Sequence, residues 1–123
     1  MSFVGKDGLI VAQFIGGQIN GPCAPEAAQR AAISRAYFAA YGHAFHIEVE
    51  SRRYKPVRGG DNHWQLRDHF AKKRKETRIA SELEELSIWR KQCDYDKNFV
   101  GNLPQTVKSA LNDAEHIIES IKK

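Results

Sequence analysis

The chain has 123 residues, of which 41% are hydrophobic and 28% are charged, and this fits one domain of 1–123 that buries its own core. No stretch approaches the ~20 apolar residues of a membrane span, and residues 1–17 lack a secretory signal pattern, so we expect a cytoplasmic protein without membrane association. Cys23 and Cys93 form no CxxC pair, which excludes a disulfide framework, and the net charge of +4 is only mildly basic.

The clearest element in the N-terminal half is a long, alanine-rich helix. Residues 3–15 are apolar and predict a shorter helix before it, weakened by glycines, and residues 16–24 predict a loop. Pro25 suits a first helical turn, and the run to about Val49 repeats Ala at three- and four-residue steps. Small residues at these steps let a neighbouring helix approach closely, so we expect a central, mostly buried helix. The aromatic residues expected to fill the space beside the alanines are Tyr37, Phe38, Tyr41 and Phe45.

Three more helices are predicted in the second half of the chain. The predicted ranges are a basic loop at 51–60, helices at 62–75 and 77–93, an irregular segment at 94–104, and a last helix at 105–121. Asp61 or Asn62 can cap the first of these helices, and Pro104 opens the last. The apolar stripes of the last two helices are Ile79, Leu83, Leu86 and Cys93, then Val107, Ala110, Leu111, Ala114, Ile117, Ile118 and Ile121. We therefore predict an all-α fold, an antiparallel up-and-down helical bundle of four to five helices.

Positive charge is concentrated in residues 51–78. This segment holds ten basic and three acidic residues, a net charge of +7, whereas the rest of the chain holds nine basic and twelve acidic residues, a net charge of −3. A basic patch for an anionic partner such as nucleic acid is one interpretation. A solvated helix face beside a loop is the other, and the sequence leaves both open.

Two segments carry a family resemblance. Residues 32–41, AISRAYFAAY, resemble the "AISRAYYAAFHAA" helix of many prokaryotic HEPN-domain proteins. Residues 83–96, which contain WRKQCDYD, are similar to the later "L..L...R..ADYD" motif of the same group. The helix that ends at 114–121 resembles more loosely the closing helix of that group, and the three segments together span 27–121.

The resemblance implies a bundle of four to five helices that is usually a homodimer. No cofactor is expected. It also implies a possible partner, a minimal nucleotidyltransferase encoded beside it in a toxin–antitoxin type module. Some HEPN proteins are metal-independent ribonucleases, whose motif is an Arg, four to six intervening residues, and then a His.

At the position of that ribonuclease motif, this chain has Arg90, four residues, and Tyr95. A phenol with a pKa near ~10 is a poor base at neutral pH. Arg90 and Tyr95 could instead bind a phosphate or a base, with Asp94 orienting Arg90. The alternative is a purely structural Arg90–Asp94 pair one helical turn apart.

A second Arg-x4-His spacing joins Arg58 to His63. Two glycines lie between them and a predicted helix starts there, and both features suit an approaching phosphate. A catalytic or phosphate-binding role for His63 competes with a helix-cap or surface role.

The central helix contributes Ser34 and Arg35 to the candidate site. An Arg in an alanine-rich, buried stretch must be paired or must reach a cleft, and Asp94 is the expected partner. One polar cleft would then be lined by Arg35, Arg90 and Tyr95. The alternative is that the Arg35–Asp94 pair has only a structural role and fixes the register of the two helices.

The remaining histidines are expected to have no role in a site. His43 and His46 have a spacing that can chelate a metal, but no third ligand is apparent, so no metal site is predicted. His69 and His116 are expected at the surface.

Three functions follow from these patterns. The first is a HEPN-like protein that binds a nucleotide, RNA or a nucleotidyltransferase partner, with Ser34, Arg35, Arg90, Asp94 and Tyr95 as binding residues. The second is a metal-independent endoribonuclease with His63, Arg58 and Arg90 as catalytic residues. The third is a non-catalytic dimerisation module.

Overall fold

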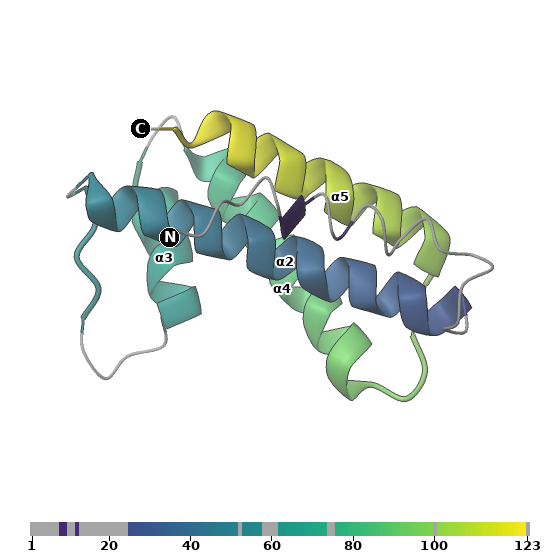
Figure 1. The fold of residues 1–123 in the computed structure, drawn as a ribbon. Helices are drawn as coiled ribbons and strands as arrows, with labels where there is room; N and C mark the ends of the chain where they lie inside the picture. The colour runs from purple at the N-terminus through teal and green to yellow at the C-terminus, as the bar shows by residue number, and fades with distance from the viewer. Residues whose placement is uncertain are drawn as a thin grey trace.

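A computed structural model describes residues 8, 9, 12, 25–51, 53–57, 62–73, 76–99 and 101–122. Its four bounded helices are α2 (Pro25–Glu50), α3 (Asn62–Ala71), α4 (Thr77–Tyr95) and α5 (Leu103–Ser120), and the described residues contain no strand (Figure 1). The predicted all-α helical bundle is therefore confirmed. The predicted helix at 3–15 lies outside the described residues except at Gly8, Leu9 and Ala12, which are helical, and the predicted loop at 16–24 lies wholly outside them.

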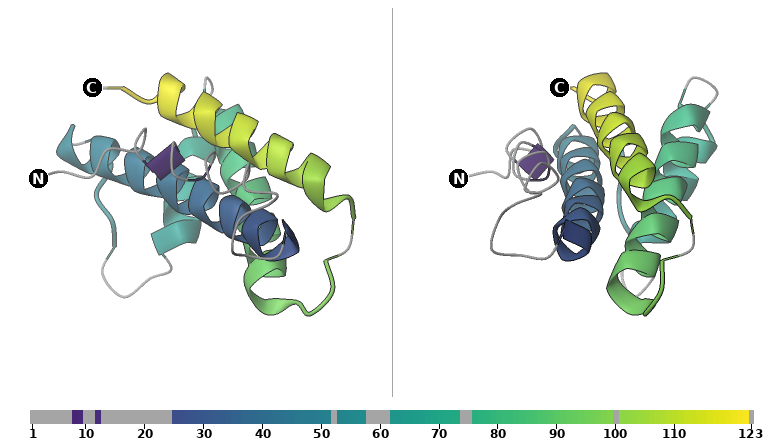
Figure 2. Two further views of the ribbon diagram at one scale, coloured as in Figure 1. Left: turned by 45° about the vertical axis from the view of Figure 1, so that its right-hand side comes forward. Right: turned by 90° about the vertical axis from the view of Figure 1, so that its right-hand side faces the viewer.

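The three long helices pack on one another. α2 and α5 lie side by side and point the same way, and α4 runs back against both of them (Figures 1 and 2). The short α3 packs against α4. None of the helices in the described part of the chain has the length and apolarity that crossing a bilayer needs.

The core follows the predicted stripes. Alanines of α2 are almost completely buried, as the close approach of α4 and α5 requires. These alanines are Ala28, Ala32, Ala36, Ala39, Ala40 and Ala44. The predicted stripe residues of α4 are all buried. Those of α5, and Ile121 directly after it, are also buried, apart from the half-buried Leu111.

Local hydrogen bonds set the helix ends. The Asn102 side chain accepts a hydrogen bond from the Gln105 backbone N–H at 3.0 Å, so α5 starts at Leu103, two residues before the predicted start. α3 ends at Ala71, short of the predicted 75, because Lys73 N–H bonds back to the Phe70 carbonyl at 3.1 Å in a tightened turn.

The start of α2 is tied to the end of α4 by one side chain. The Arg30 guanidinium donates to the carbonyls of Gln92 at 3.4 Å, Cys93 at 3.2 Å and Asp96 at 2.7 Å. These carbonyls lie at the C-terminal end of α4, where backbone carbonyls lose their helical partners and carry a partial negative charge, although Gln92 O also accepts the Asp96 N–H at 3.1 Å. Arg30 therefore fixes the level at which the late motif of α4 lies against α2.

Candidate functional site

The two motif segments that suggested a family touch each other. Ser34 on α2 donates a hydrogen bond from Oγ to Oδ2 of Asp94 on α4 at 3.4 Å. Arg90 Nη1 lies 3.6 Å from the same carboxylate oxygen. Asp94 thus links a hydroxyl of the central helix to a guanidinium one turn earlier on its own helix.

Aromatic rings surround the Arg90 guanidinium. Its Cζ lies 5.2 Å from the ring centre of Tyr37, 5.4 Å from that of Phe38 and 5.9 Å from that of Tyr95. A cation over an aromatic face is stabilised by about 0.5–2 kcal/mol, more when water is excluded. The Arg90 side chain is only 13% exposed, and its Nε is buried without a hydrogen-bond partner among the described residues. Ser34, Tyr37, Phe38, Arg90, Asp94 and Tyr95 are called the Arg90 cluster below.

The outer part of the Arg90 cluster faces solvent. Tyr95 is 74% exposed and Phe38 is 47% exposed, although both are large aromatic residues that usually gain by burial. Lys91 is exposed one helical turn before Tyr95. The surface therefore offers two rings for stacking beside a mostly buried guanidinium, with a flexible cation nearby.

Arg35 is not part of this arrangement. It is exposed, and Asp94 pairs with Arg90 and Ser34 instead, so the expected Arg35–Asp94 pair is wrong. The reason is helical phase: position 35 lies at the edge of the buried face of α2, on the same side as the exposed residues Ala31 and Phe38.

Tyr37 joins His63 to the Arg90 cluster. The Tyr37 hydroxyl and His63 Nδ1 share a hydrogen bond, and the His63 ring stacks on Tyr41 with the ring centres 4.2 Å apart. The Tyr37 ring also contacts Arg90, so one buried phenol touches both a His and an Arg. Arg58, the predicted partner of His63, lies outside the described residues.

Sequence reasoning missed the roles of two residues near this site. Tyr37 was predicted only as a space-filling aromatic, and Arg30 was not singled out. Their partners are distant in sequence: Arg30 contacts Cys93, 63 residues away, and Tyr37 contacts His63, 26 residues away. The local sequence pointed to Arg30 only through Glu26, four residues earlier on the same helix, whose carboxylate lies 3.6 Å from the Arg30 guanidinium.

His43 and His46 do not converge on one point. His43 Nε2 lies 2.6 Å from the Ile121 carbonyl, whereas His46 Nε2 pairs with Glu50 at 3.0 Å. Among the described residues, no group of three or more His, Cys, Asp or Glu side chains could hold a metal ion.

His69 and His116 were expected at the surface, but each binds a buried glutamate. His69 Nε2 lies 3.0 Å from Glu48 Oε1, and His116 Nδ1 lies 2.5 Å from Glu82 Oε1. Both glutamates are more than nine-tenths buried and require such partners. The expectation is wrong for His69, whose side chain is only 13% exposed, whereas the His116 side chain is 33% exposed. Neither partner could be inferred locally, because both glutamates lie on other helices.

Glu48 is the centre of an ion cluster between α2 and α3. It pairs with Arg53 Nε at 2.6 Å, His69 Nε2 at 3.0 Å and Lys73 Nζ at 3.3 Å. Burial acts to raise the pKa of Glu48, but hydrogen bonds from His69 and Arg53 and the charge of Lys73 outweigh it, and the pKa lies below its ordinary value.

Among the described residues of the predicted basic patch, four side chains pair with carboxylates within the fold. Besides Arg53 and Lys73, Lys72 pairs with Asp68 at 2.9 Å, and Arg78 lies 3.6 Å from Glu82. Of the basic residues of 51–78 that the structure describes, Lys55 and Arg67 have no ion pair. Glu48 and Glu82, which lie outside this segment, therefore offset part of the positive charge of its described residues.

Cys93 is not a nucleophile in this fold. Burial raises the pKa of its thiol to about 11, so the thiol stays protonated at neutral pH. Cys23 lies outside the described residues.

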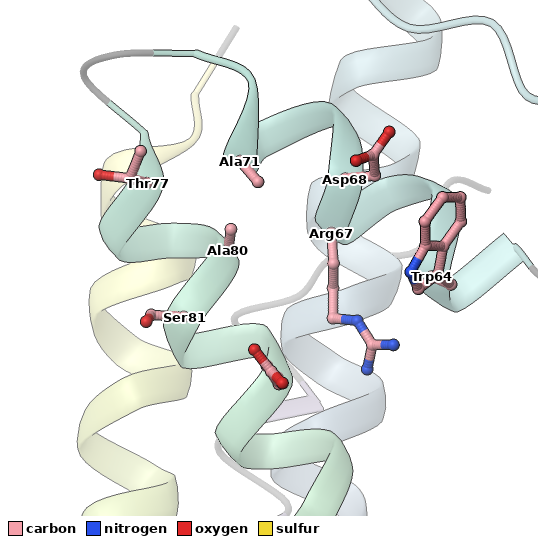
Figure 3. Close-up of a pocket in the computed structure, with 8 residues that line it drawn as sticks. Trp64, Arg67, Asp68, Ala71, Thr77, Ala80 and Ser81 are labelled. Carbon is pink, nitrogen blue, oxygen red and sulfur yellow. The ribbon is translucent and has the colours of Figure 1, made fainter.

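Two hollows flank α3, and neither contains a residue of the Arg90 cluster. The first, of about 320 Å³, lies between α3 and α4; Figure 3 shows Arg67 extending along it from α3 and Trp64 at one end. The second, of about 390 Å³, lies between the segment 54–57 and α3. Trp64 and Asp68 line both hollows.

No family model, curated protein or solved structure matches this chain.

Proposed function

We propose that the chain is a HEPN-like cytoplasmic protein that binds RNA or a nucleotide through the Arg90 cluster. The contact between the two motif segments supports this proposal, because Ser34 bonds to Asp94 and Arg90 packs over Tyr37. A homodimer and a minimal nucleotidyltransferase partner, in a toxin–antitoxin type module, belong to the same proposal.

Single-stranded RNA is the ligand that best suits the chemistry of the cluster. Unpaired bases stack on exposed aromatic rings, and each stacked base is worth about 1–3 kcal/mol. Phe38 and Tyr95 present such rings to solvent, on two different helices that meet at Arg90. Asp94 holds the guanidinium in place, and Lys91 supplies a mobile charge for the backbone.

Binding is favoured over cleavage because the cluster has a phenol where the related motif has an imidazole. A phenol rarely provides a base at neutral pH. The endoribonuclease remains the second candidate, because Tyr37 contacts both His63 and Arg90 and so brings a His and an Arg to one cluster.

Fluorescence anisotropy of a labelled, unstructured RNA 12-mer tests the binding proposal. Tyr95→Ala and Phe38→Ala each remove an exposed ring and are expected to weaken binding about tenfold or more, the loss of one stacked base. The matched control is Ile88→Ala, which removes an exposed apolar side chain, 50% exposed, from the same helix as Tyr95. Equal affinities for Tyr95→Ala, Ile88→Ala and the unchanged chain would refute the proposal.

Cleavage assays separate the two candidates. Incubation of RNA with the protein in excess EDTA is expected to leave the RNA intact. Cleavage that disappears in His63→Ala but persists in His46→Ala would replace the binding proposal with the endoribonuclease. An RNA affinity that does not fall with salt would favour the dimerisation module, because phosphate contacts release counterions.

A further inference from the structure

The hollow of about 390 Å³ beside α3 is a second candidate site that the proposed function does not use. Its volume falls in the range of small-molecule sites. One wall is the segment 54–57 and the other is a face of α3 that continues into Lys72 and Lys73. No residue of the Arg90 cluster lines it, so the two sites can be tested separately.

The 54–57 wall is held in place by hydrogen bonds. Val57 N–H donates to Gln65 Oε1 at 2.8 Å, and Gln65 Nε2 donates to the Val57 carbonyl at 3.3 Å. At the other end, the Tyr54 N–H bonds to the Glu48 carbonyl at 3.2 Å. The hollow is therefore formed before any ligand arrives, and binding does not need to order this segment.

Positive charge dominates the lining. Lys55, Lys72 and Lys73 line the hollow against one carboxylate, that of Asp68. Lys55 is exposed and has no ion pair among the described residues, and the Lys72 side chain is 75% exposed with Asp68 as its partner. Lys73 is turned toward Glu48. Lys55 and Lys72 are thus the two cations that can reach an anion at the mouth.

Aromatic rings complete the lining. Trp64 is 56% exposed and Tyr54 is half-buried, and both line the hollow. The Tyr54 hydroxyl is buried and has no hydrogen-bond partner among the described residues. Two rings and two accessible ammonium groups in one preformed hollow suit a molecule that carries a planar ring and a phosphate.

We propose that this hollow binds a phosphate monoester of a planar, ring-bearing compound of the size of a nucleoside monophosphate. The ring lies against Trp64 and Tyr54, and the phosphate is bound by Lys55 and Lys72.

Calorimetric titration of the full chain with AMP, adenosine and inorganic phosphate tests this site. AMP is expected to bind at one equivalent, and Lys55→Gln and Lys72→Gln are each expected to weaken it about tenfold, the effect of one lost charge-assisted contact. Adenosine is expected to bind at least about tenfold more weakly than AMP for the same reason. AMP is also expected to quench the tryptophan fluorescence, and Trp64→Phe is expected to remove that change.

A matched control makes the result specific. Lys108→Gln removes an exposed lysine of α5, a helix that contributes no residue to the lining, and is expected to leave AMP binding unchanged. Absence of AMP binding, equal affinities for AMP and adenosine, or full affinity in Lys55→Gln would each overturn the proposal. Loss of AMP binding in Arg90→Gln, with retention in Lys55→Gln, would assign the ligand to the Arg90 cluster and overturn it as well.

Discussion

Replacing Glu48 with glutamine removes one buried negative charge and keeps the shape of the side chain. Glu48 is 1% exposed and pairs with Arg53, His69 and Lys73. In the glutamine variant these three side chains lose the carboxylate that accepts their hydrogen bonds. Breaking a fully buried ion pair costs about 3–5 kcal/mol. The Arg53 and Lys73 side chains are 42% and 36% exposed, so water compensates part of their loss. We expect Glu48→Gln to lower the free energy of unfolding by about 2–3 kcal/mol.

Urea denaturation followed by circular dichroism at pH 7 measures this difference directly. In a separate thermal melt, the melting temperature of Glu48→Gln is expected to lie about 10 °C below that of the unchanged chain, for a domain of this size. Glu119→Gln is the matched control, because Glu119 is exposed and makes no ion pair with the described residues. A Glu48→Gln protein within about 0.5 kcal/mol of the unchanged chain, the range of ordinary surface substitutions, would refute the reasoning.

The pH dependence gives a second check on the same cluster. Because the pKa of Glu48 is lowered in the folded state, its contribution to stability is present above the ordinary glutamate pKa and is lost as the pH falls through the folded value. The stability difference between the unchanged chain and Glu48→Gln should therefore shrink below about pH 4. A difference that stays constant from pH 7 to pH 3 would show that Glu48 acts by packing alone.

Three further predictions concern the packing of the helices. Burial, and then the hydrogen bond and charge of Glu85, raise the pKa of Asp113 to about 8, so its ionisation destabilises the fold as the pH rises toward that value. Asp113→Asn should thus be no more stable than the unchanged chain near pH 4 and more stable near pH 8, in thermal melts at both values. Arg30→Gln should lower the free energy of unfolding by about 1–2 kcal/mol and speed amide exchange at the end of α4, since it removes the donor that binds several carbonyls there. Ala36→Leu should cost about 1–3 kcal/mol in urea denaturation by overpacking the contact of α2 with its neighbours, whereas Ala31→Leu at an exposed position should cost almost nothing.

The sequence by itself determined the helices and most of their buried faces. The last helix was expected at 105–121 and is found at Leu103–Ser120, and the expected helix at 77–93 is found at Thr77–Tyr95. Periodicity, prolines and caps act over one or two helical turns, so they can be read without knowing the neighbours. The same local patterns indicated Arg90 and Asp94 as a pair, which the structure contains.

Only the tertiary structure decided which side chains meet across helices. The side chain that contacts the end of α4 is that of Arg30, not that of Arg35. His69 pairs with the buried Glu48 instead of lying in solvent. Helical periodicity shows that a position is on a buried face, but the partner at that face depends on the angle and the level at which two helices pack. These quantities follow from the sum of all side-chain contacts between α2, α3 and α4, and no short stretch of sequence contains them.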